Sequence, residues 1–439
     1  MKEIGIKNII TAVFVVSAVL ALLIFSGVVK LGEDPQAVAG NVLIWGDISS
    51  EIMEPLVDNL RGENLEVSYV QKRTPTYEDD LINAFASGSG PDLFIMPHEQ
   101  LLRHSDKVFE IPYASFPRET FESLYIDEAR LFLTDTGIIG LPITVDPLIM
   151  YYNKSLISSA FILDIPEYWD EFTEFSPKIT DYTGSGEILV SATAMGSYDN
   201  ISNAKAIISA LLLQNGNALV GVDEFSGERF GTLSSEEGID QSIQVIDFYT
   251  SFARFGSNTY SWNEALIDSQ NKFIAGEVAT YFGRASEVED ISRKNPNLDF
   301  GVSLLPQLRS TNNRITQGSM LGVGISKQTK NVTGSFSTAS NITAEGFSGG
   351  LAAGLLVAPA NKALLGNTPD DAFLTLVYNS AIISAGWVDP EPSRTSDLFR
   401  NIIRNVNSGA LSTEEALQRA NRDLDTILDQ TINKFSSTN

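Results

Sequence analysis

The sequence has no cysteine and only two histidines among its 439 residues. The missing thiols exclude disulfide bonds, thiol catalysis, iron–sulfur clusters, cysteine-ligated zinc and a lipidated cysteine as membrane anchor. Two histidines also argue against a histidine metal site. We therefore expect no metal and no cofactor, and no phosphate-binding loop or GxSxG motif suggests otherwise.

Basic residues are scarce as well. The chain carries 30 Lys and Arg against 55 Asp and Glu, which gives a formal net charge of −25. A polyanion gains nothing from the release of counterions on nucleic acid, so we expect no nucleic-acid partner. Because 43% of the residues are hydrophobic, the chain can nevertheless bury the cores of two or three domain-sized units.

The N-terminal region has one long uncharged run, Ile9 to Val29. At about 1.5 Å per residue it is long enough for one transmembrane helix. We therefore predict a membrane anchor in residues 1–30, which contacts the membrane through residues 9–29, followed by a linker in residues 31–40. The alternative is a signal peptide cleaved after Ala39, in a small-residue segment. Either reading places the body of the protein outside the cell, as an anchored or a secreted domain.

Strand and helix patterns alternate after the linker. Residues 42–45 and 65–70 form apolar or alternating strands, residues 93–96 form a third, and helical spacing lies between them. This βαβαβ order predicts a parallel sheet, in which ligands bind beyond the carboxyl ends of the strands. The loops at residues 46–50 and 97–100 are therefore the first candidates for a binding site.

A second α/β region follows, with strands predicted at residues 188–191, 278–282 and 300–304 and helices at residues 203–213 and 235–252. The last helix begins with the capping-box sequence Ser412-Thr-Glu-Glu415. Residues 331–350 are rich in Ser, Thr, Gly and Asn, and we expect at most a poorly formed helix there. Trp169 is assigned to packing.

Several segments, in order and spacing, resemble the extracellular solute-binding proteins of ABC importers. The similarity is to family 1, the periplasmic-binding-protein type 2 group that includes maltose-binding protein, over about residues 42–429. The chain departs from that family in lacking a cysteine for lipid anchoring. The segments that carry the resemblance are Gly90-Pro-Asp-Leu-Phe94, Gly140-Leu-Pro-Ile-Thr-Val-Asp-Pro-Leu-Ile-Met-Tyr-Tyr-Asn-Lys154, Ile165-Pro-Glu-Tyr-Trp-Asp-Glu-Phe172, Phe273-Ile-Ala-Gly-Glu-Val-Ala279, Asn295-Pro-Asn-Leu-Asp-Phe300 and Gly386-Trp-Val-Asp-Pro390.

The resemblance implies an α/β fold of two lobes with an interlobe cleft, here preceded by the transmembrane helix. Lobe 1 is expected to comprise residues 41–143 and 301–333, and lobe 2 residues 147–298 and 334–439. The implied function is to capture a small solute, with a carbohydrate as the first choice, and deliver it to the transmembrane subunits of an ABC permease. We expect a monomer without enzymatic activity.

The candidate ligand contacts follow from strand ends and from the resemblance. Asp, Glu and Arg bind paired sugar hydroxyls, and aromatic rings cover the apolar face of a sugar ring. Trp45 has packing in the lobe core as its rival role, and Asp146 has acceptance of backbone N–H groups. The full set is Trp45, Asp47, His98, Glu99, Asp146, Tyr198, Arg284, Ser286, Trp387, Arg394 and Ser396.

Two other functions use the same features. An extracellular glycosidase needs a pair of carboxylates at a cleft, which Asp47, Glu99 and Asp146 are able to supply. A sensor or envelope receptor would use the same two-lobe body without a permease. No pattern in the sequence marks either function specifically.

Overall fold

The computed structural model describes residues 40–433 except 63, 312–313 and 368. The predicted transmembrane segment, Ile9 to Val29, lies outside this range, and so does the predicted cleavage site after Ala39. Within the described ranges, a helix able to span a membrane is not found.

The chain forms two compact units. Unit 1 comprises residues 40–144, 320–354 and 359–366, and unit 2 comprises residues 145–319, 355–358 and 367–433. Two long strands, β6 (Leu141–Asn153) and β13 (Thr316–Ile325), each contribute residues to both units. The first passage between units, at Thr144–Val145, falls between residue 143, the predicted end of the first part of lobe 1, and residue 147, the predicted start of lobe 2.

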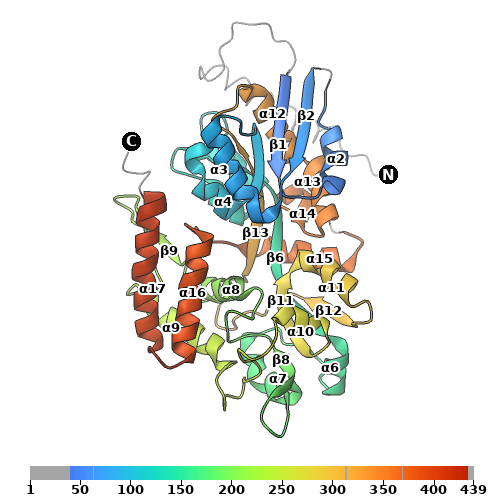
Figure 1. Cartoon of the computed structure of the whole chain (residues 1–439), viewed down its shortest axis with the longest axis vertical. Coiled ribbons are helices and arrows are strands. Elements are labelled where there is room, and N and C mark those ends of the chain that lie inside the picture. Colours follow the sequence, from blue (N-terminus) through green and yellow to red (C-terminus); the bar gives the residue numbers. More distant parts are fainter. Residues whose placement is uncertain (1–39, 63, 312–313, 368, 434–439) are drawn as a thin grey trace. The chain divides into compact units, whose positions relative to one another are not determined.

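Unit 1 contains the predicted βαβαβ arrangement (Figure 1). Strand β1 pairs in parallel with both β2 and β3, and β13 joins β3 in the antiparallel direction, which the prediction of a parallel sheet did not anticipate. The elements of this arrangement are β1 (Gly40–Gly46), α2 (Ser50–Asp58), β2 (Leu65–Gln71), α3 (Tyr77–Ser87), β3 (Leu93–Pro97) and α4 (His98–Arg103). Further elements of the unit are β4 (Ile111–Pro112), α5 (Arg118–Leu124), β5 (Gly137–Ile138), α12 (Val332–Ile342), α13 (Glu345–Leu355), β14 (Ala358–Pro359) and α14 (Lys362–Leu365).

Local sequence explains the boundaries of the first elements. The buried positions of β1 alternate with less buried ones, as a half-covered strand requires, and Val42 and Ile44 are fully buried. Helix α3 ends where Gly88 adopts a left-handed conformation with φ 70°. Glycine reaches this conformation without a steric penalty, and the chain can therefore turn there into β3.

Unit 2 is built on a sheet in the order β6-β11-β8-β7, with β12 also paired to β6. Strand β11 runs antiparallel to β6 and parallel to β8. The elements in the first part of this unit are α6 (Lys154–Ser159), α7 (Phe172–Ile179), β7 (Asp181–Tyr182), β8 (Ile188–Thr193), α8 (Ala204–Gln214), β9 (Val220–Val222), β10 (Arg229–Gly231) and α9 (Ile239–Ser251). The remaining elements are α10 (Ser269–Ile274), β11 (Val278–Arg284), α11 (Val288–Lys294), β12 (Phe300–Ser303), α15 (Ala372–Ile382), β15 (Ser384–Ala385), α16 (Pro392–Asn407) and α17 (Thr413–Leu428).

Two local predictions in unit 2 are confirmed. Helix α17 begins with the expected capping box, in which Ser412 Oγ accepts from the Glu415 N–H and Glu415 Oε2 accepts from the Ser412 N–H. Trp169 is a packing residue with 2% of its surface exposed, and its Nε1–H donates to Gln214 Oε1 at 2.7 Å.

The units differ from the predicted lobes at two places. Residues 301–319 belong to unit 2, because Gln307 is tied to it by backbone hydrogen bonds with Glu167 and Trp169. Residues 334–354 and 359–366 belong to unit 1, where α12 packs on β1 and Ser348 Oγ donates to the Ile143 carbonyl at 2.8 Å. These contacts join segments far apart in the sequence, so composition alone did not reveal them.

The prediction of a poorly formed helix in residues 331–350 is wrong. The segment contains helix α12 and most of helix α13. Asn331 caps α12, because its Oδ1 accepts from the Gly334 N–H at 3.0 Å, and Phe336, Ile342 and Phe347 are buried. Burial of these side chains outweighs the weak helix propensity of the Ser, Thr and Gly residues.

Candidate functional site

In unit 1, four predicted residues gather at one edge of the sheet. Trp45 and Asp47 lie at the end of β1, and His98 and Glu99 directly follow β3. These strands are parallel neighbours, with Ile44 opposite Leu93, so their carboxyl ends meet at the same edge. The prediction that the loops after these strands share one edge is confirmed, while the ligand contacts themselves stay predictions.

Trp45 is half-buried rather than part of the core. The Lys72 Nζ lies 3.4 Å from the centroid of the Trp45 ring, a cation–π contact, and the Trp45 carbonyl accepts from Tyr77 OH at 2.9 Å. Its Nε1–H is buried and has no hydrogen-bond partner among the described residues. A buried indole N–H normally has an acceptor, so Trp45 is suited to hydrogen-bond a bound polar molecule.

Asp47 is half-buried beside two tyrosines whose hydroxyls are engaged. Tyr69 OH donates to the Ile48 carbonyl at 2.7 Å, and Tyr77 OH donates as described above. Burial raises the pKa of both tyrosines, and the negative charge of Asp47 raises each pKa further. Both hydroxyls therefore stay protonated, and the carboxyl groups at this edge are those of Asp47 and Glu99.

His98 and Glu99 differ in exposure. The His98 side chain is only 2% exposed and its ring packs edge-on to Phe132, whereas the Glu99 side chain is 20% exposed. His98 Nδ1 lies 3.4 Å from Glu99 Oε2 but makes no hydrogen bond within the described chain. Glu99 is thus the more accessible of the two candidate contacts.

In unit 2, the sheet brings another set of candidates to one edge. Tyr198 follows β8 and Arg284 ends β11, and these strands are parallel. Strand β6 runs antiparallel to β11. Asp146 is near the start of the part of β6 that belongs to unit 2, and it therefore lies next to the end of β11. Residues more than 130 positions apart in the sequence therefore meet.

Asp146, Arg284 and Ser286 form one hydrogen-bonded group. The Asp146 carboxylate accepts from Ser286 Oγ at 2.6 Å and from the Ser286 N–H at 3.2 Å. Arg284 Nη1 donates to the carbonyls of Asp146 and Gln317, at 2.9 and 3.0 Å, and Nη2 donates to the Gln317 side chain. Asp146 thus accepts a backbone N–H, as its alternative role requires. Its carboxylate nevertheless remains at this edge of the sheet.

Burial raises the pKa of Asp146 above its ordinary value, and the opposing effects of the Arg284 charge and the Ser286 hydrogen bonds are smaller. A carboxyl with a raised pKa in the folded chain contributes stability that is fully present below its unfolded pKa, about 3.9, and is lost as the pH rises through the folded value. Ionised Asp146 is therefore a source of instability at neutral pH.

We expect the free energy of unfolding of the wild type, relative to that of Asp146→Asn, to fall as the pH rises from about 4 towards 7. The asparagine does not ionise, and its side-chain oxygen still accepts from Ser286. Urea unfolding of both proteins at a series of pH values measures the difference. A difference that does not change with pH would contradict the raised pKa.

Tyr198 and Ser396 also meet, as their hydroxyl oxygens lie 2.8 Å apart. Tyr198 is 7% exposed, and burial is the main cause that raises its pKa. Arg400, one turn along α16 from Ser396, lies with its guanidinium carbon 5.5 Å from the centroid of the Tyr198 ring. Tyr198 is therefore a buried residue and not an exposed tyrosine on a surface loop.

Trp387 and Arg394 do not join either group by any contact observed. Trp387 is 6% exposed and packs edge-on to Phe399 with the ring centroids 6.3 Å apart, which is a core position. Arg394 Nη1 donates to Gln430 Oε1 at 2.9 Å and lies 3.4 Å from Glu391 Oε2. Both contacts are local to α16 and the C-terminal segment.

Further residues, none of them among the candidates from the sequence, hold these groups in place. Glu287 accepts from the Arg284 N–H at 2.8 Å and from Asn203 Nδ2 at 2.9 Å, and so fixes the end of β11. Gln317 binds the guanidinium of Arg284, and Lys72 covers Trp45. Only the sheet pairing brings these partners together, and no spacing in the sequence signals them. No cluster of three or more potential metal ligands occurs in the described ranges.

Comparison with known proteins identifies the family. Residues 59–340 match the family described as Bacterial extracellular solute-binding protein. A galactooligosaccharide-binding protein of Bacillus subtilis (strain 168) is 22% identical over 287 residues, which cover 64% of this chain and 63% of that protein. A maltotriose-binding protein of Pyrococcus abyssi (strain GE5 / Orsay) is 22% identical over 283 residues, covering 63% and 56%. The alignments thus span less than two thirds of these relatives.

The fold has counterparts among solved structures. The sugar-binding protein MalE from Xanthomonas citri aligns with a TM-score of 0.73 at 17% identity, over 91% of this chain and 100% of that one. This similarity establishes the α/β two-lobe fold of the periplasmic-binding-protein type. The family match covers well over half of the chain, and its members bind solutes outside the cytoplasm and are not enzymes, which rules against the glycosidase alternative. The chain belongs to the family of bacterial extracellular solute-binding proteins.

Proposed function

We propose that this protein binds a carbohydrate outside the cytoplasm and delivers it to the permease of an ABC importer. The observation that carries the proposal is the family match, together with two relatives whose names specify oligosaccharides. The residues at the two sheet edges suit this ligand. They offer carboxylates, hydroxyls and an aromatic N–H, which are the groups that bind sugar hydroxyls.

The proposed contacts in unit 1 are Trp45, Asp47 and Glu99. Trp45 offers a buried N–H without a partner in the described chain, and Glu99 offers a partly accessible carboxylate. His98 would orient Glu99 from behind, because its ring is almost fully buried beside it.

The proposed contacts in unit 2 are the carboxylate of Asp146 and the hydroxyls of Ser286, Tyr198 and Ser396. Arg284 also has a structural role, because three of its five guanidinium N–H groups donate hydrogen bonds to other residues of the protein. It holds Asp146 and Gln317 and leaves two N–H groups for a ligand. We do not propose direct ligand contacts for Trp387 and Arg394, since the contacts of both residues support α16.

Anchoring through residues 9–29 and a monomeric state are further parts of the proposal. They rest on the uncharged run and on the net charge of −25, which disfavours self-association. Detergent extraction of the full-length protein from membranes, compared with a chain that starts at Gly40, tests the anchor.

A thermal-shift screen against mono- and oligosaccharides tests the proposed function. A bound sugar raises the melting temperature, because it stabilises the folded state by mass action. For a sugar that gives a shift, we expect Glu99→Ala and Asp146→Ala to weaken binding by about 1–3 kcal/mol each, since each removes an acceptor for ligand hydroxyls. Isothermal titration calorimetry measures these losses.

Glu224→Ala is the matched control, because Glu224 is an exposed carboxylate on the turn between β9 and β10, distant in sequence from every proposed contact. Its affinity should equal that of the wild type. If neither Glu99→Ala nor Asp146→Ala differs from this control, the site assignment fails. If no saccharide shifts the melting temperature, the carbohydrate proposal fails while the family membership stands.

A further inference from the structure

Helix α6 ends in a conformation that is unusual for its sequence. The Phe161 N–H donates to the Ser158 carbonyl at 3.0 Å, and the Ile162 N–H donates to the Ile157 carbonyl at 3.2 Å. These two bonds form a Schellman motif, in which the residue at the Phe161 position takes a left-handed conformation. Phe161 has φ 57°, a conformation that usually belongs to glycine because a Cβ atom is disfavoured there.

The Phe161 side chain is not buried by the fold, so burial does not offset the strain of this backbone conformation. It is 92% exposed, and Leu163, two residues further on, is 96% exposed. Glycine at position 161 would satisfy the same helix end with less strain, so the fold does not require phenylalanine there. Large apolar side chains that stay exposed together are typical of interaction surfaces.

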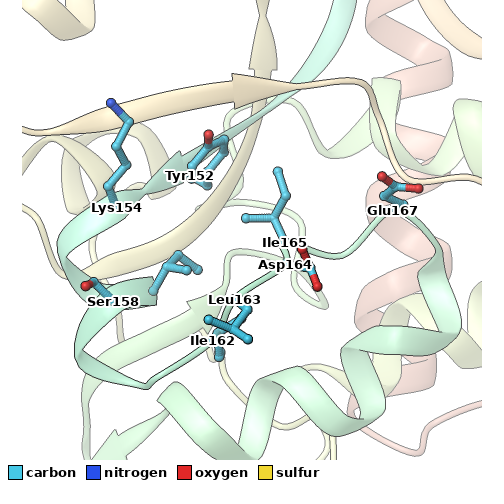
Figure 2. A pocket seen from close by; sticks show the side chains of 9 residues that line it. Tyr152, Lys154, Ser158, Ile162, Leu163, Asp164, Ile165 and Glu167 are labelled. Carbon is cyan, nitrogen blue, oxygen red and sulfur yellow. The ribbon is translucent and has the colours of Figure 1, made fainter.

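The same loop borders two pockets of unit 2. Figure 2 shows the first, of 320 Å³, where Ile162, Leu163 and Ile165 lie across from Tyr152 at the end of β6 and Lys154 at the start of α6. The second pocket, of 840 Å³, shares Ile162, Asp164, Ile165 and Glu167 with the first. We call residues 161–167, with these two pockets, the α6–α7 surface.

Five acidic side chains line the two pockets of the α6–α7 surface, against three basic ones. Of the basic side chains, Lys154 and Arg309 pair with carboxylates, and Lys178 forms no ion pair within the described ranges. Asp164, Glu167 and Glu174 line its pockets, and none of their carboxylates forms an ion pair within the described ranges. The carboxylates of Asp170 and Glu171, by contrast, are paired with Arg309. Three carboxylates are therefore available to basic groups of a partner, next to exposed apolar side chains.

We propose that the α6–α7 surface docks a segment of a partner protein that presents apolar and basic side chains together. Phe161 and Leu163 contact the apolar face of this segment, and Asp164, Glu167 and Glu174 pair with its lysines or arginines. An anionic lipid surface would be repelled by these carboxylates. A second copy of this chain would also be repelled, since each copy carries a net charge of −25.

A synthetic peptide provides the probe. We would use a fluorescently labelled helical peptide of about 14 residues, made of leucine and lysine with all lysines on one face. Its binding to the full chain is measured by fluorescence anisotropy at about 0.15 M salt, where exposed charges are screened. We expect Phe161→Gly to weaken binding by about tenfold or more, as removal of an interface anchor does.

Phe161→Gly separates docking from folding. Glycine is favoured at this helix end. The melting temperature of Phe161→Gly should therefore equal or exceed that of the wild type, while its peptide binding is weakened. A second variant, Asp164→Asn with Glu167→Gln, should weaken binding several-fold and reduce its dependence on salt. The matched controls are Phe225→Gly and Glu224→Gln with Glu228→Gln, because the turn between β9 and β10 also exposes a phenylalanine, 99% accessible, among carboxylates.

Several outcomes would overturn the proposal. They include no binding of the peptide by the wild type, equal losses in the Phe225→Gly control, and equal binding of a leucine–glutamate peptide. Binding to phosphatidylglycerol vesicles that Phe161→Gly abolishes would assign the surface to a membrane. A dimer in sedimentation that Phe161→Gly dissociates would assign it to a second copy of the chain.

Discussion

Replacing Trp169 with alanine is expected to lower the free energy of unfolding by about 3–5 kcal/mol, the range for truncation of a large buried aromatic side chain. Trp169 lies among Phe172, Phe248 and Phe282, with ring centroids 5.2 to 6.0 Å from its own. The substitution removes these contacts and also leaves the Gln214 side-chain oxygen without its donor in a buried environment.

Denaturant unfolding, monitored by circular dichroism, measures the change. Circular dichroism is preferred because the substitution removes one of the tryptophans that a fluorescence signal would report on. Trp169→Phe is the informative comparison, since it keeps an aromatic ring but loses the hydrogen bond to Gln214. We expect it to cost about 1–3 kcal/mol, less than the alanine variant. A value for Trp169→Ala within the range of an exposed substitution would mean that this cluster does not support the core of unit 2.

The second large effect is expected from Lys205→Met. The Lys205 ammonium pairs with the Asp389 carboxylate, and it also donates to Thr395 Oγ1 at 2.7 Å and to the Pro392 carbonyl at 3.2 Å. Asp389 is 1% exposed, so removing its counter-charge leaves a carboxylate in a poorly solvated environment. Breaking a buried pair in this way typically costs about 3–5 kcal/mol.

Lys205→Met should also weaken sugar binding, if the proposed contact of Ser396 is correct. Lys205 holds Pro392 and Thr395 at the start of α16, and Ser396 is the next residue of that helix. Looser packing there would displace the Ser396 hydroxyl from Tyr198. Unfolding experiments and calorimetry on the same variant separate the two effects.

Lys154→Met is the matched control for the ion pair. Lys154 pairs with Asp299 at 3.0 Å, but both side chains are exposed, at 49% and 65%. Solvent screens such a pair, so its removal should cost at most about 1 kcal/mol. Equal losses in Lys154→Met and Lys205→Met would indicate that the pair at Asp389 is no more important than a surface contact.

Where the sequence was a good guide, the signal was local. The capping box at Ser412 and the strand patterns at residues 42–45, 65–70 and 93–96 each depend on residues within a few positions of one another. Such patterns are visible without a structure, because backbone geometry and hydrogen bonding repeat over one helical turn or two strand residues. The same holds for strand ends, which correctly placed Trp45, Asp47 and Glu99 at one sheet edge.

Other features depended on contacts between distant residues. Phe336 and Phe347 stabilise helices in a segment whose composition predicted little helix, because burial overrides propensity. Tyr198 is buried because α16 covers it from 198 positions away in the sequence, a contact that no local pattern marks. The left-handed conformation and the exposure of Phe161 are also properties of the folded chain alone. The sequence does not show which apolar residues remain in solvent.

The sequence by itself determined the class of the protein. Its motifs, in their order, identified an extracellular solute-binding family, and its lack of cysteine and excess of acid excluded other chemistries. Only the tertiary structure decided that Asp146, Arg284 and Ser286 form one group and that residues 301–319 belong to unit 2. The physical reason is that periodicity and capping act over a few residues, whereas strand pairing joins side chains separated by more than a hundred.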